Sequence, residues 1–144
     1  MWWKKNKQAE PDLVSQREQL NRMATILLSQ SEVDFDRATQ LEQALIGTFI
    51  FGMIHAHGIS QGLTPPQVHA LGLTVFKDSL HYTDEAAVQG VQECINATKP
   101  GYHATMNAIL HRGIDGYQQY QKDNLAGLHE NITTVLTQFK NPGS

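Results

Sequence analysis

The segment ALIGTFIFGMI, residues 44–54, is the most hydrophobic stretch of this 144-residue chain. It is about half as long as the ~20 apolar residues that a membrane span requires. The segment therefore predicts a buried core helix. Its two glycines, Gly47 and Gly52, each cost about 1 kcal/mol relative to alanine inside a helix. Such a cost indicates that another element packs closely against the helix backbone.

A second pair of glycines, Gly113 and Gly116, lies in the segment ILHRGIDGY at residues 109–117. Residues three apart share one face of a helix, so this pair forms a flat strip. We therefore predict a close crossing between this helix and the one that contains residues 44–54. The four packing glycines of this prediction are Gly47, Gly52, Gly113 and Gly116.

Apolar residues recur at steps of three and four along most of the chain, which is the spacing of amphipathic helices. The pattern predicts six helices, at about residues 12–30, 34–57, 65–80, 83–98, 102–121 and 123–139. Gly58 is the expected stop of the second helix, Thr64 and Gln67 form a capping box for the third, and Asp123 caps the sixth. We expect one all-α domain over residues 12–140, with a frayed or disordered N-terminus at 1–11 and a tail at 141–144.

The charge distribution indicates which partners suit this domain. The net charge is −3, and residues 31–101 hold eight acidic and three basic residues. Phosphate binding needs a basic surface, so nucleic acid is not the expected ligand, whereas a cationic protein would fit. Cys94 is the single cysteine, which excludes an intrachain disulfide and favours a reduced compartment. Residues 1–12 contain no signal-peptide core, so we expect a cytoplasmic protein; no role follows for Trp2 and Trp3.

Acidic side chains gather near the starts of the second and fourth predicted helices. They include Asp34, Asp36, Asp84 and Glu85. Carboxylates there stabilise the helix dipole, and capping plus solvation explains most of them. If the two groups meet on one surface, they would hold a basic partner.

The HRGID motif has three interpretations. Asp115 lies four residues from His111 and three from Arg112, so its carboxylate can reach either side chain on a helix. The favoured interpretation is a structural polar network of His111, Arg112 and Asp115. Alternatively, Arg112 and Tyr117 are exposed anchors for a partner, since both residue types are frequent at interface hot spots. A catalytic His–Asp pair is the third interpretation.

The sequence supplies little else for catalysis, and we expect neither an enzyme nor a cofactor nor a metal. His55 and His57 are two residues apart, which directs them to different sides of a helix. Two alternatives stay open. One is a helical ligand-binding or regulatory module with a pocket between the second and fifth helices; the other is a metalloenzyme that uses His55, His111 and Asp115.

Three segments resemble a known family. FIFGMIHAHG at 49–58, LTPPQVHALGLTVF at 63–76 and NAILHRGIDGY at 107–117 are similar to bacterial immunity protein family 48. The resemblance implies a small all-α protein, encoded beside a secreted toxin, that binds and silences the toxic domain without catalysis. It implies no catalytic residues. An inhibitor without an export signal would meet its toxin in the cytoplasm.

Overall fold

The structure, a computed structural model, describes residues 12–140. These residues form six α-helices and one short 3-10 helix without a strand, which confirms the predicted all-α fold. The elements in chain order are α2 (Leu13–Ser31), η1 (Phe35–Arg37), α3 (Gln40–Gln61), α4 (Pro65–Asp78), α5 (Asp84–Ala97), α6 (Ala104–Gln121) and α7 (Leu125–Lys140). The expectations for residues 1–11 and 141–144 lie outside the described residues.

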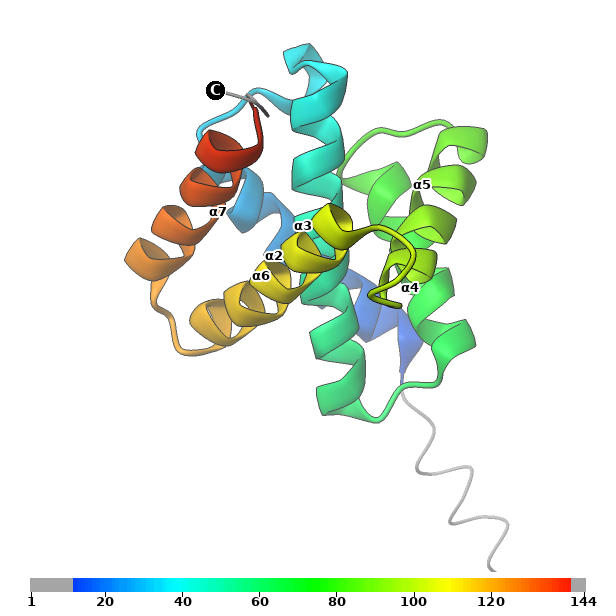
Figure 1. Cartoon of the computed structure of the whole chain (residues 1–144). Helices are drawn as coiled ribbons and strands as arrows, with labels where there is room; N and C mark the ends of the chain where they lie inside the picture. Colours follow the sequence, from blue (N-terminus) through cyan, green and yellow to red (C-terminus); the bar gives the residue numbers. More distant parts are fainter. Residues whose placement is uncertain (1–11, 141–144) are drawn as a thin grey trace, which may run out of the picture.

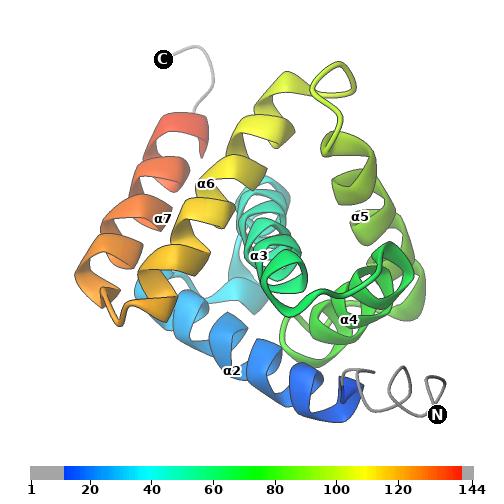
Figure 2. The ribbon, with the colours of Figure 1, turned by 90° about the horizontal axis from the view of Figure 1, so that it is seen from below.

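Helix α3 runs through the middle of the molecule, and the other five α-helices surround it (Figures 1 and 2). It contacts each of them, and every residue from Leu45 to Ile54 is buried. A helix that is enclosed on all sides must be apolar on all sides. This explains why residues 44–54 are the most hydrophobic stretch of the chain. None of the helices within residues 12–140 is long and apolar enough to cross a membrane.

The bounds of α3 differ from the predicted 34–57. It begins at Gln40 because Thr39 is extended and forms a capping box with Glu42, in which the Thr39 hydroxyl accepts from the Glu42 amide at 3.1 Å. It continues through Gly58, where a Cβ would collide with the Val68 side chain. The helix ends before Gly62, whose φ of 69° is the left-handed conformation that glycine adopts without strain.

The predicted start of α4 is confirmed. Thr64 and Gln67 form a reciprocal capping box, and Pro65 is the first helical residue. The Thr83 hydroxyl caps α5 by accepting from the Ala86 amide at 3.2 Å. The sequence predicts both helix starts because each cap joins residues only three apart.

The starts of α6 and α7 correct two expectations. Helix α6 begins at Ala104, where the His103 Nδ1 accepts from the Met106 amide at 3.1 Å. For α7, the Asn124 side chain accepts from the Gly127 amide at 3.0 Å. Asp123 is not the cap; it has a φ of 56° and belongs to the turn before the helix.

Candidate functional site

Helices α3 and α6 cross at Gly52, Gly113 and Gly116. A Cβ on Gly52 would collide with the Leu110 carbonyl oxygen, and one on Gly113 would collide with the Phe49 carbonyl oxygen. A Cβ on Gly116 would lie 2.7 Å from the Phe49 ring. The HRGIDG motif therefore places the backbone of α6 directly against the core helix, and its two glycines are needed for that packing.

Gly47 does not take part in this crossing, which corrects the prediction. A Cβ there would lie 3.7 Å from both Phe76 and Tyr82, an ordinary van der Waals distance. On α3, Gly47 faces Phe76 at the end of α4 and Tyr82 in the following loop, whereas Gly52 faces α6. A small pocket of about 80 Å³ lies beside the crossing, between these two helices as predicted, with Gly52 and His55 of α3 and Leu110 and His111 of α6 among its lining residues.

The three polar residues of the motif do not form the predicted network. The His111 Nδ1 lies 2.8 Å from the carbonyl oxygen of Asn107 in the preceding turn. Arg112 donates to the Asn131 carbonyl oxygen on α7 at 3.4 Å. Asp115 is exposed, and within residues 12–140 no hydrogen bond or ion pair links it to either residue. Water can solvate an exposed carboxylate as well as a neighbouring side chain can, so spacing alone does not create a bond.

Arg112 belongs instead to the contact between α6 and α7. The Asn131 side chain, 6 % exposed, donates to the Arg112 carbonyl oxygen at 2.9 Å and to the Gln119 side chain at 3.1 Å. In return, the guanidinium of the half-buried Arg112 donates to the Asn131 carbonyl oxygen. This reciprocal pairing joins the two helices.

Tyr117 is buried, with 6 % of its surface exposed, so the expectation of an exposed anchor is wrong. Its hydroxyl lies 3.0 Å from the His57 Nδ1 and accepts from the Gln121 side chain at 2.7 Å. The Ser60 hydroxyl lies 3.1 Å from it and donates to the His57 carbonyl oxygen at 2.8 Å. No sequence pattern indicated this network, since its members are far apart in the chain.

His57 joins three helices through its two ring nitrogens. The Gln16 side-chain oxygen on α2 is hydrogen-bonded to Nε2. Because an amide oxygen can only accept a hydrogen bond, Nε2 carries the proton. Nδ1 is then the acceptor for the Tyr117 hydroxyl on α6. Burial lowers the pKa of His57, which favours this neutral form. With both partners buried, the arrangement orients helices and leaves neither ring nitrogen free for chemistry.

The acidic groups of η1 and α5 lie on neighbouring segments. Asp36 bonds to the His81 Nδ1 at 3.1 Å, and the rings of Phe35 and Tyr82 are 6.0 Å apart. His81 and Tyr82 directly precede the start of α5, where Asp84 and Glu85 are exposed. The four carboxylates therefore lie on or next to the two segments that meet in this contact. We call Asp34, Asp36, Asp84 and Glu85 the acidic surface.

Two of these carboxylates have a cation nearby. Asp34 lies 3.7 Å from Arg37, and Asp84 lies 3.7 Å from Lys77. All four side chains are solvent-exposed, and exposed pairs of this length contribute little stability. The pairs lower the net charge of the acidic surface without neutralising Asp36 and Glu85.

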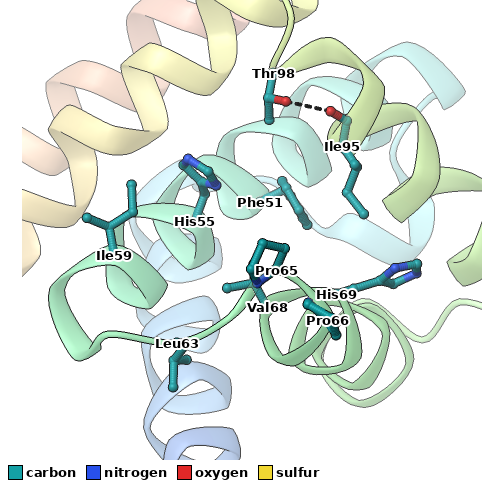
Figure 3. Close-up of a pocket in the computed structure, with 10 residues that line it drawn as sticks. All are labelled: Phe51, His55, Ile59, Leu63, Pro65, Pro66, Val68, His69, Ile95 and Thr98. Atoms are coloured by element: carbon teal, nitrogen blue, oxygen red, sulfur yellow. Dashed lines mark hydrogen bonds between the residues drawn. The ribbon is translucent and has the colours of Figure 1, made fainter.

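An apolar groove of about 550 Å³ lies between α3, α4 and α5 (Figure 3). Its ten lining residues are Phe51, His55, Ile59, Leu63, Pro65, Pro66, Val68, His69, Ile95 and Thr98. The Thr98 hydroxyl donates to the Ile95 carbonyl oxygen at 2.6 Å at one edge. Concave apolar sites of this size are typical of ligand binding. No sequence pattern indicated this groove, because its walls come from three helices.

His55, at the edge of the groove, has a lowered pKa. Burial is the main cause, and the nearby His111 adds to it. The proposed trio of His55, His111 and Asp115 does not form a metal site, since among the described residues no three potential ligands converge. Cys94 is also buried, and burial raises its pKa to about 12, so the thiol stays protonated.

Comparison with curated proteins and with solved structures gives no match. The model of one protein family, described as immunity protein 48, matches residues 17–140. That range covers all of α3 to α7 and most of α2, including the glycine crossing, so the chain belongs to the immunity protein 48 family.

Proposed function

We propose that this protein is an antitoxin that binds a cognate toxin domain in the cytoplasm and neutralises it by forming a stoichiometric complex. The observation that carries the proposal is the family match over residues 17–140. An immunity protein needs a toxin as its partner, and inhibition by binding requires no catalytic group of its own. We further propose that the toxin is encoded by the adjacent gene.

The acidic surface is the proposed site of first contact. Complementary charges accelerate the encounter between two proteins and exclude wrong partners. Asp36 and Glu85 are exposed on segments that touch each other through His81 and Tyr82. This placement supports a basic toxin surface as the counterpart. Arg112, which is half-buried, would have at most a secondary part in the contact, and Tyr117 has none.

Co-expression tests the proposal directly. The toxin domain of the adjacent gene would be produced in a bacterial host with and without this protein, with growth and complex formation by gel filtration as the measurements. We expect arrest without the protein, and growth with a co-eluting complex when it is present. A harmless neighbouring product, or arrest that continues with the protein present, would show the proposal to be wrong.

Charge reversal tests the acidic surface separately. The double variant Asp36→Lys with Glu85→Lys should weaken the complex and make its formation slower at low salt. Glu130→Lys, on the exposed side of α7, is the matched control and should bind like the original protein. Equal affinity of all three proteins would place the contact elsewhere.

A second candidate function rests on the groove in Figure 3. Its volume of about 550 Å³ and its apolar walls suit a small apolar molecule. Native mass spectrometry of the purified protein would detect such a molecule as an added mass that organic extraction removes. A single mass equal to that of the polypeptide would speak against this candidate.

A further inference from the structure

A second groove, of about 290 Å³, lies between α3, α5 and α6. We call it the α3–α5–α6 groove. Tyr82 lines it and also contacts Phe35, which stands between Asp34 and Asp36 in η1. Figure 2 shows α5 and α6 on either side of α3. Tyr82 therefore links the groove to the contact between η1 and the α4–α5 loop, the two segments that carry the acidic surface.

The floor of this groove is apolar and its rim is accessible. Leu45, Phe76 and Ile109 lie at the floor with exposed fractions of 5 %, 2 % and 2 %. Leu41 and Ala44, from the first turns of α3, line the groove and are exposed. An apolar side chain that enters here would remove apolar surface from water on both partners.

The rim carries negative charge and no lysine or arginine among its lining residues. Glu93, exposed on α5, is the charged lining residue. His103 lines the opposite side, and its Nδ1 accepts from the Met106 amide at the start of α6. Asp36 and Glu85 add further negative charge beyond Tyr82.

We propose that the α3–α5–α6 groove receives an apolar side chain of the toxin that is flanked by lysine or arginine, with Glu93 and the acidic surface holding the flanking cations. This inference rests on the proposed function and names the chemistry of the partner. An apolar anchor in a pocket, surrounded by polar contacts, is the common arrangement of an interface hot spot.

Charge complementarity selects a toxin segment over a second copy of this chain. Two copies that met at this groove would bring Glu93 and the acidic surface of each against those of the other. Like charges placed together across an interface oppose association. A basic segment of another protein meets no such repulsion.

The test uses the purified full chain and the toxin domain of the adjacent gene, with affinity measured by titration calorimetry. Ala44→Phe places a ring at the mouth of the groove and should lower affinity on the order of tenfold or more. Its matched control is Ala126→Phe, the same change at an exposed position of α7, which does not line the groove. Thermal unfolding of both variants checks that each one folds.

A second variant addresses charge without filling the groove. Glu93→Lys should weaken binding about tenfold and reduce the salt dependence of the association rate, whereas Glu130→Lys should change neither. Gel filtration of the free proteins shows whether the groove instead joins two copies.

The outcomes separate the two proposals. If the original protein binds and neutralises the toxin while Ala44→Phe and Glu93→Lys bind equally well, the groove assignment is wrong and the immunity function stands. A self-association that both variants abolish would also overturn it in favour of a second copy. If the original protein neither binds nor neutralises the toxin, the function itself is wrong and the groove assignment falls with it.

Discussion

Gly52 and Gly113 lie face to face where α3 and α6 cross: a Cβ on Gly113 would lie 3.0 Å from the Cα of Gly52, and one on Gly52 would lie 3.1 Å from the Cα of Gly113. Real Cβ atoms rarely come so close, and the nearest obstacles here are backbone atoms, which cannot rotate away. The whole backbone of one helix would have to shift to admit a methyl group at either position.

We therefore expect Gly113→Ala to destabilise the protein by about 1–3 kcal/mol or more, as overpacking of a core does. Gly47→Ala is the matched control, because its Cβ would have ordinary contacts at 3.7 Å. Alanine there should stabilise the helix by about 0.5–1 kcal/mol. Urea unfolding followed by circular dichroism measures both. Equal stability of the two variants would mean that the backbones of α3 and α6 are far enough apart at the crossing to admit a methyl group.

Tyr117→Phe removes the hydroxyl that the His57 ring and the Gln121 side chain share. Because this leaves a buried nitrogen of His57 without a partner, we expect a loss of about 1–3 kcal/mol in unfolding free energy. Tyr120→Phe, on the same helix and half-buried, should change stability by less than about 0.5 kcal/mol. If Tyr117→Phe unfolds at the same urea concentration as the original protein, the network contributes no stability.

The lowered pKa values of His55 and His57 predict how stability depends on pH. Burial lowers the pKa of His57 below its usual 6.5 in the folded protein, and the pKa of His55 is shifted the same way. Below pH 6.5 the unfolded chain binds protons more readily than the folded one, so stability is complete above that pH and is lost as the pH falls.

Urea midpoints at pH 7.5, 6.5 and 5.5 measure this dependence. We expect the midpoint to fall with pH in the original protein and to fall less steeply in His57→Gln, although that variant is less stable at pH 7.5. An unchanged slope in His57→Gln would assign the dependence to other groups.

Cys94 should resist thiol reagents in the folded protein. Its pKa is raised to about 12: burial is the main cause and Glu93 adds to it, while a hydrogen bond with Thr48 works in the opposite direction. The reactive thiolate is therefore scarce at pH 8. We expect slow reaction with a disulfide reagent in buffer and rapid reaction in denaturing urea, followed by absorbance. Fast reaction in buffer would show that this part of the domain opens readily.

Local features of the sequence were sufficient for most of the helices. The Thr64–Gln67 capping box and the Thr83 cap join residues three apart, so the pattern alone locates the starts of α4 and α5. The start of α3 was predicted too early. The apolar spacing extends back to Phe35, while the capping box of Thr39 and Glu42 starts the helix later.

The candidate site was harder to predict, since residue type and spacing do not determine burial. Tyr117 was expected on the surface, yet it lies on the side of α6 that faces His57, 60 residues earlier in the chain. Asp115 is within reach of two partners by spacing and bonds to neither. Both outcomes depend on which face of α6 the neighbouring helices cover.

The sequence by itself determined the helical class, the hydrophobic core helix and the family, because helix periodicity, caps and family motifs are encoded by residues close together in the chain. Only the tertiary structure decided that Gly52 meets Gly113, that Tyr117 and His57 are buried together, and that Glu93 and Tyr82 line one groove. The physical reason is that burial and contact arise from helices distant in sequence, whose mutual orientation no local pattern specifies.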